Sequence, residues 1–215
     1  MVFRRKSSYS RLDIMDDAAR AAARGRGRKA IRGYSRVLDV DPLDFEAHSR
    51  VAPLFARAGE INKSWTSFRL VAETYLAKGF HAKAAGVYVQ ASRHMPKKKE
   101  VWESLSDVYL MRDLKADAVD SLFLGHRHFK GRYRATAIKF LEKAREIEPW
   151  RYNVTKRLAR LLSRTGRKDE ALSMLQGLAA REPGKNLRKV RGDIFRLSPG
   201  FNTAWLWLRA AIKGR

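Results

Sequence analysis

Three side chains that could grip a carboxylate stand at helical spacing in residues 152–164. Asn153, Lys156 and Arg160 are three and four residues apart, so they share one face of an α-helix. Arg157 and Arg164 flank them. Their amide, ammonium and guanidinium groups can donate charge-assisted hydrogen bonds to carboxylates. A row of such donors on one helix face can contact an acidic group, and the alternative is an ordinary solvated face.

The sequence offers little for catalysis or for metal binding. The nearest histidine pair, His126 and His128, points to different sides of a helix. The stretch GRGRKA at 25–30 lacks the spacing of a phosphate-binding loop and follows no expected strand. No Ser-His-Asp order stands out, and the chain has no cysteine. We expect a protein that is not an enzyme, without cofactor or metal.

Positive charge is concentrated at both ends of the sequence. The 215 residues carry a net charge of +24. Residues 1–36 contribute +8, residues 37–132 contribute +3 and residues 133–215 contribute +13. Such a field attracts polyanions, namely an acidic protein surface, nucleic acid or anionic lipid. The basic ends are represented by Arg24, Arg26, Arg28, Lys29, Lys185, Arg188 and Lys189.

Four prolines divide the chain into helical stretches. Pro42, Pro96, Pro149 and Pro183 each follow an apolar, helix-like segment, and proline cannot continue a helix. We expect helices near 13–24, 28–39, 45–58, 61–77, 81–94, 99–112, 115–129, 134–147, 185–197 and 201–213, besides two in 152–183.

The last proline interval is 34 residues, the period of a helix–turn–helix repeat. In residues 152–185, Leu158, Gly166, Ala171 and Pro183 fall at the motif positions of that period, and similar matches recur upstream. The chain thus resembles the tetratricopeptide repeat family over roughly residues 11–185. The resemblance implies an all-α fold, a right-handed α-solenoid of antiparallel helix pairs with about 12 helices.

The expected organisation has three parts. Residues 1–12 form a basic segment, residues 13–183 the repeat array and residues 184–215 a basic helical cap or docking segment. Within the array we expect repeats at 13–42, 45–77, 81–112, 115–149 and 152–183. The proline intervals of 54 and 53 residues hold three helices each, which makes the inner and outer faces ambiguous there.

In this family the first helix of a pair lines a peptide-binding groove, and Asn153, Lys156 and Arg160 occupy its clamp positions. The resemblance therefore implies a clamp for an acidic partner. The preceding groove helix places Glu100, Glu103 and Asp107 at the same positions. These residues would repel an acidic ligand and suit a basic one, so the match is partial.

The stretch RGRGRKAIRG, residues 24–33, allows two interpretations. Gly25 falls at the turn position between two expected helices, and Ala30, Tyr34 and Val37 give the second helix an apolar stripe. An inter-helix turn with charged edges is the simpler interpretation. The alternative is a disordered basic arm.

The final helix also allows two interpretations. Phe201, Trp205, Leu208 and Ile212 share one face, which we expect to cover the end of the array. Trp207 would then point away, as an exposed aromatic side chain of a helix that docks on a partner or on anionic lipid. Trp205 and Trp207 are the candidate docking residues.

The start of the chain lacks the apolar run of a signal peptide, and its most apolar segment is too short to span a bilayer. We therefore expect a cytoplasmic protein. The function that these features favour is a non-catalytic scaffold or adaptor, or a subunit of a larger assembly, that binds acidic protein partners. The alternatives are non-specific binding of nucleic-acid phosphates and, more weakly, peripheral association with anionic membrane.

Overall fold

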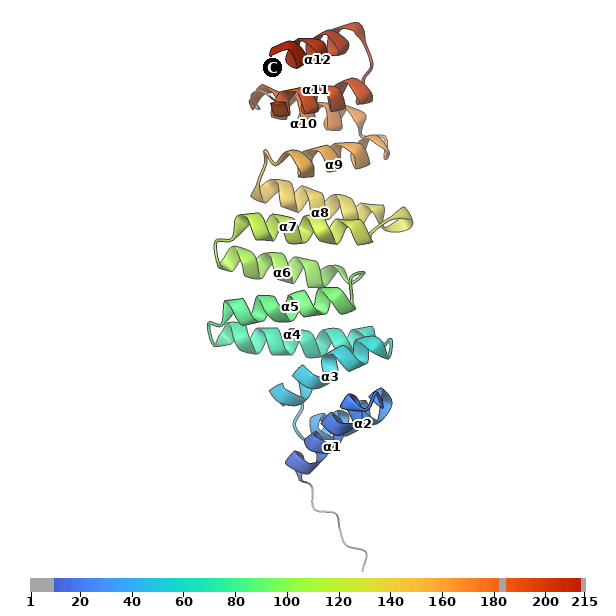
Figure 1. Cartoon of the computed structure of the whole chain (residues 1–215), viewed down its shortest axis with the longest axis vertical. Helices are drawn as coiled ribbons and strands as arrows, with labels where there is room; N and C mark the ends of the chain where they lie inside the picture. Colours follow the sequence, from blue (N-terminus) through green and yellow to red (C-terminus); the bar gives the residue numbers. More distant parts are fainter. Residues whose placement is uncertain (1–9, 182–184, 214–215) are drawn as a thin grey trace, which may run out of the picture. The chain divides into compact units, whose positions relative to one another are not determined.

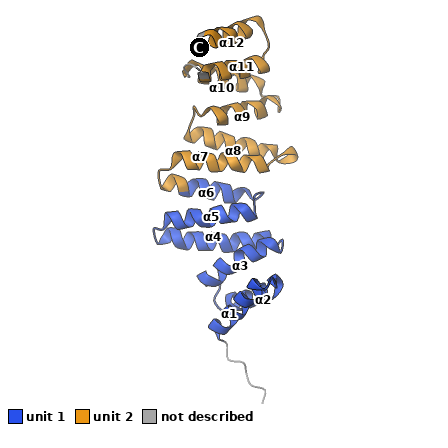
Figure 2. Cartoon of the chain, in the orientation of Figure 1, with its two compact units in different colours: residues 1–108 blue, residues 109–215 orange. Residues whose placement is uncertain are grey.

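The computed structural model describes residues 10–181 and 185–213, and it divides into two compact units (Figure 2). Unit 1 is Met1–Val108 and unit 2 is Tyr109–Arg215. The described residues form twelve α-helices and no strand. The predicted all-α class is therefore confirmed. Residues 1–9, part of the expected basic segment 1–12, and Pro183 lie outside the described residues.

Unit 1 is built from helices joined by short turns (Figure 1). Consecutive helices pack on one another from the first to the fifth. Because the connections are short, neighbouring helices run antiparallel, as the solenoid prediction required. The helices are α1 (Arg11–Ala23), α2 (Gly27–Val40), α3 (Phe45–Arg57), α4 (Ile61–Ala77), α5 (His81–His94) and α6 (Lys99–Met111), the last containing the boundary between the units.

Unit 2 continues the same pattern with one irregular connection. The helix expected at 115–129 ends at Gly125, and two 3-10 turns, His126–His128 and Gly131–Tyr133, lead into the next helix. Consecutive helices again pack on one another, and α11 also contacts α9. The helices are α7 (Lys115–Gly125), α8 (Arg134–Ile147), α9 (Tyr152–Ser163), α10 (Lys168–Arg181), α11 (Lys185–Leu197) and α12 (Phe201–Lys213).

The opening stretch RGRGRKAIRG is an inter-helix turn. Helix α1 ends at Ala23 and α2 begins at Gly27. Gly25 between them has φ 71°, and Arg26 N donates to Ala21 O at 2.9 Å, which closes the helix end. Ala30, Tyr34 and Val37 of α2 are buried, as the apolar stripe predicted. The prediction of a turn is confirmed.

Small residues are buried in the helices of unit 2. Ala137 and Ala171 are at most 2 % exposed, and Leu158, Leu162 and Leu175 fill the space around the α9–α10 pair. Gly166 ends α9 with φ 86°, the left-handed conformation expected at that turn. Leu158 and Ala171, which fall at motif positions of the expected repeat, therefore lie in the core of unit 2.

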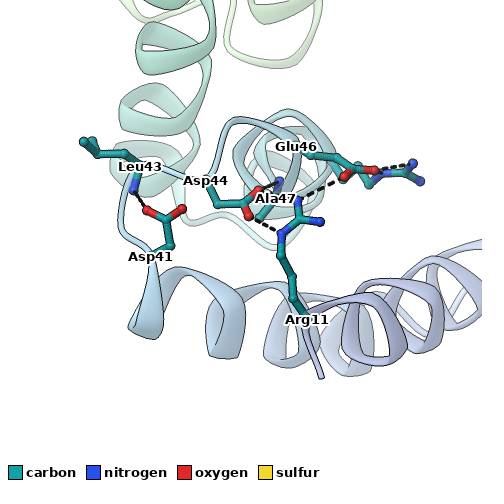
Figure 3. A network of polar contacts seen from close by, with 7 residues as sticks. Arg11, Asp41, Leu43, Asp44, Glu46 and Ala47 are labelled. Carbon is teal, nitrogen blue, oxygen red and sulfur yellow. Dashed lines mark hydrogen bonds and ion pairs between the residues drawn. The ribbon is translucent and has the colours of Figure 1, made fainter. Parts of the chain in front are cut away.

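An ion-pair network fastens α1 to the loop before α3 (Figure 3). The Arg11 guanidinium donates to Asp44 Oδ1 and to Glu46 Oε2, each at 3.0 Å. Asp44 is also the N-cap of α3, because its Oδ1 accepts from Ala47 N at 2.8 Å. The hydrogen bond from Arg11 holds the pKa of the Asp44 carboxyl below its usual range.

This network predicts acid sensitivity in unit 1. Because the folded pKa of Asp44 is lowered, its stabilising contribution is complete above the unfolded value of about 4 and is lost as pH falls through the folded value. Asp44→Asn keeps a good N-cap but loses the charge. We expect it to cost about 0.5–1 kcal/mol at neutral pH, since Arg11 is partly exposed. Urea unfolding at neutral pH and at a pH below the lowered folded pKa of Asp44 checks this, because the cost should vanish there.

Candidate functional site

The candidate clamp residues all lie on α9 or its C-cap but face different surroundings. Asn153, Arg160 and Arg164 are exposed, whereas Lys156 and Arg157 are half-buried. The exposed three are available to a partner. The other two are engaged within unit 2, so the sequence-based set divides into a free group and an internally bonded group.

Lys156 is paired with a buried carboxylate of α11. Its Nζ lies 3.5 Å from Asp193 Oδ2, which also accepts from the Tyr152 hydroxyl at 2.8 Å. Burial of the ring raises the pKa of Tyr152, and the nearby Asp193 charge adds to this effect. Arg196 donates to the other oxygen, Asp193 Oδ1, at 3.1 Å. Asp193 thus connects α9 to α11 and partly neutralises Lys156.

Arg157 points toward the 3-10 turn that follows α7. Its Nε donates to His126 Nε2 at 3.1 Å, and the other ring nitrogen of His126 contacts Phe123 O. Burial lowers the pKa of His126 to about 4, so the ring is neutral at pH 7 and can accept this hydrogen bond. His126 therefore has a structural role. The half-buried side chain of Arg157 contributes to the packing of unit 2 through this contact, besides carrying a positive charge.

A cavity of about 730 Å³ opens where α9, α11 and α12 meet. Four of its side chains are cationic, and two others are aromatic. The one acid that the described contacts place beside these cations is Asp193, already bonded to Lys156 and Arg196. We call this the basic cavity; its lining is Tyr152, Lys156, Arg188, Lys189, Gly192, Arg196 and Trp207.

Trp207, which lines the basic cavity, takes part in an aromatic stack between α11 and α12. The rings of Phe195 and Trp207 are parallel within 5°, with centroids 6.1 Å apart. The Trp207 indole lies over Gly192, where an added Cβ would be 3.1 Å from its Nε1. Gly192 therefore lets the indole approach the backbone of α11.

The orientation expected for α12 is wrong. Trp207 is half-buried against α11, and Ala210 on the same side is only 4 % exposed. The stripe that was expected to cover the array instead faces outward, with Phe201 85 % exposed and Trp205 58 % exposed. Both stripes have helical spacing, so periodicity alone does not show which of them is buried. The contacts of the Trp207 indole with Gly192 and Phe195 of α11 decide it.

The basic ends fall into two separate groups. Arg24, Arg26, Arg28 and Lys29 lie around the α1–α2 turn of unit 1, where all four are exposed. Arg188 and Lys189 of unit 2 line the basic cavity, whereas the side chain of Lys185 lies outside the described residues. The sequence assigned Arg188 and Lys156 to different sites, and the structure brings them to one.

The sequence of α11 itself indicates a basic helix face. Arg188, Gly192 and Arg196 are spaced by four residues, so they share a helix face. That face carries two cations around a glycine. Nothing in the sequence indicated that it would meet Lys156 of α9, since that contact depends on packing.

The part of the chain that the structure describes contains no cluster of three or more His, Cys, Asp or Glu residues placed to hold a metal ion. Within the same part, no helix is both long enough and apolar enough to cross a bilayer.

Residues 131–194 match the family model described as tetratricopeptide repeat. This segment runs from the turn before α8 into α11, and it includes the helix that carries the candidate clamp. Residues 131–194 are therefore a tetratricopeptide-repeat segment, and the resemblance seen in the sequence is confirmed there. No curated protein matches the chain.

The chain also aligns with solved structures. MamA is 17 % identical with a TM-score of 0.33, over 93 % of this chain and 95 % of that one. A thermophilic tetratricopeptide-repeat protein of Thermus thermophilus is 18 % identical with a TM-score of 0.31, over 95 % and 90 %. PilF of Pseudomonas aeruginosa is 16 % identical with a TM-score of 0.30, over 94 % and 89 %.

Proposed function

We propose that this protein is a non-catalytic scaffold that holds an acidic segment of a protein partner in the basic cavity. Tetratricopeptide-repeat proteins generally mediate protein–protein interaction. The observation that carries the proposal is the cavity lining, with four cations against a single carboxylate that is already bonded.

The cations at the opening of the cavity define what it would bind. The Arg196 side chain is 71 % exposed even though it touches Asp193, and Arg188 and Lys189 also line the opening. Guanidinium groups match carboxylates by two parallel hydrogen bonds, whereas the lysine ammonium acts as a point charge. A segment with two or more acidic side chains fits this arrangement. The exposed Arg160 and Arg164 supply further positive charge on the same unit.

A nucleic acid is the competing ligand. Single-stranded nucleic acids are commonly held by exposed aromatic rings on which bases stack, together with cations. In the basic cavity Trp207 is stacked on Phe195, and the Tyr152 hydroxyl is bonded to Asp193. These engagements favour a ligand that is read through its charge rather than through its bases.

The test is charge reversal at the cavity with a matched reversal elsewhere. Arg188→Glu with Lys189→Glu should weaken binding of a short fluorescein-labelled poly-glutamate peptide about tenfold, a loss of about 1.4 kcal/mol, measured by fluorescence anisotropy. These residues are preferred to Lys156, whose replacement would also break the pair with Asp193.

The control is Arg24→Glu with Arg26→Glu, which changes net charge equally at the α1–α2 turn of unit 1. We expect less than about a twofold effect on peptide binding, since these charges do not line the cavity and exposed charges are screened by salt. Equal losses in both variants would mean that binding reflects net charge and not the cavity. An oligonucleotide that binds more tightly than the peptide, and is weakened by both variants, would instead support the nucleic-acid alternative.

A further inference from the structure

The outer face of α12 is a continuous apolar strip without a partner among the described residues. Phe201, Trp205, Leu208 and Ile212 recur at helical spacing, and they are 85, 58, 49 and 76 % exposed. We call these four residues the outer strip. The opposite face of the helix, with Trp207 and Ala210, packs on α11. Four bulky side chains on one side of one helix exceed the scattered exposure that is normal for a soluble surface.

The outer strip belongs to a strongly basic segment of the chain. Arg209 is exposed on α12 itself, beside the strip. Residues 184–215 contain eight Lys and Arg against one acid, Asp193, and residues 194–215 contain no acid at all. A helix that combines an apolar face of Phe, Trp, Leu and Ile with basic flanks has the composition of helices that lie in a membrane interface.

We propose that the outer strip binds an anionic lipid bilayer, with α12 lying flat in the headgroup region. The thirteen residues of α12 span about 20 Å, too short to cross the hydrocarbon core but suited to lying along its boundary. Trp205 fits this depth because its ring is apolar while its indole N–H can bond to headgroups. The surface does not involve the residues of the basic cavity.

Electrostatics favours lipid over a second copy of the chain as the occupant. Two α12 faces brought together would place two strongly basic segments side by side, in a protein of net charge +24. Like charges in contact oppose association. An anionic leaflet has the complementary sign, and each basic residue near it adds to the attraction.

Cosedimentation with vesicles tests this proposal on the full chain. The protein should pellet with vesicles of phosphatidylcholine and phosphatidylserine, and it should bind vesicles of phosphatidylcholine alone far more weakly. Trp205→Glu with Leu208→Glu should weaken binding to the anionic vesicles at least tenfold, because both residues would have to enter the interface as charges. Poly-glutamate binding should stay unchanged in this variant, since neither residue lines the cavity.

The matched control is Val40→Glu with Leu43→Glu in unit 1, where both side chains are also exposed. It introduces the same charges, so it should reduce vesicle binding less than twofold. The proposal is overturned by a lack of pelleting at low salt, or by equal losses in the two variants, which would indicate binding by net charge alone. It is also overturned if the α12 variant keeps vesicle binding but loses concentration-dependent self-association in light scattering. Circular dichroism melting verifies that both variants are folded.

Discussion

Gly33→Leu is expected to destabilise unit 1 by about 3 kcal/mol or more, at the upper end of the usual cost of overpacking. A Cβ added at Gly33 would lie 2.7 Å from Ala18 Cβ and 3.4 Å from Ala18 Cα. The Ala18 methyl is fixed to the backbone of α1 and cannot rotate away. Helices α1 and α2 would therefore have to separate, which disrupts the cluster that includes Met15 and Tyr34.

Gly86→Leu is the control for this prediction, because the same substitution should there raise the free energy of unfolding and not lower it. Gly86 lies within α5, and a Cβ added there would meet nothing within 4 Å. Leucine is a better helix former than glycine, by up to about 1 kcal/mol. Urea unfolding followed by circular dichroism measures the stability of both variants. Hydrogen exchange of the α1 and α2 amides then shows whether the loss in Gly33→Leu is located in these two helices. Unchanged protection in Gly33→Leu would contradict the close crossing of α1 and α2.

Asp193→Asn should lower the stability of unit 2 by about 1.5–3 kcal/mol, the range for hydrogen bonds to a charged group. Asp193 is 6 % exposed and takes contacts from Tyr152, Lys156 and Arg196. Asparagine keeps the shape and one acceptor oxygen but removes the negative charge. The two cations would then lack their internal counter-ion.

The same substitution should tighten poly-glutamate binding about tenfold, a gain of about 1.4 kcal/mol, if the proposed function is correct. Removing the acid that contacts the cavity leaves Lys156 and Arg196 available to a carboxylate ligand. A variant that is less stable yet binds more tightly is a result that general damage to the fold does not produce. Thermal unfolding and fluorescence anisotropy on the same preparation measure the two effects.

Asp120→Asn is the matched control in unit 2. Asp120 also pairs with an arginine, accepting from Arg151 at 2.6 Å, but its side chain is 53 % exposed. Exposed ion pairs contribute little, so we expect a change of less than about 1 kcal/mol and no change in peptide affinity. Tighter peptide binding in Asp120→Asn would mean that net charge, and not the loss of the internal counter-ion, governs affinity.

The sequence alone determined the helices and most of their connections. Proline and glycine act locally, through a fixed φ or a left-handed φ, so Pro42, Gly25 and Gly166 mark helix ends whatever the helices later contact. The buried positions of α9 and α10 could be predicted for a similar reason. A helix with a single apolar stripe has only one face to bury. Leu158 and Leu162 of α9 and Ala171 of α10 lie on the buried faces of their helices.

Tertiary structure alone decided the site and the orientation of the last helix. Helix α12 has two apolar faces, and the one that is buried depends on what α11 presents to it, here Gly192 and Phe195. The same holds for Lys156, because the sequence gives its face on α9 but not the carboxylate of Asp193 that lies 37 residues away. Helical periodicity is a property of one segment, whereas a cavity and its charge balance are properties of the surfaces that packing brings together.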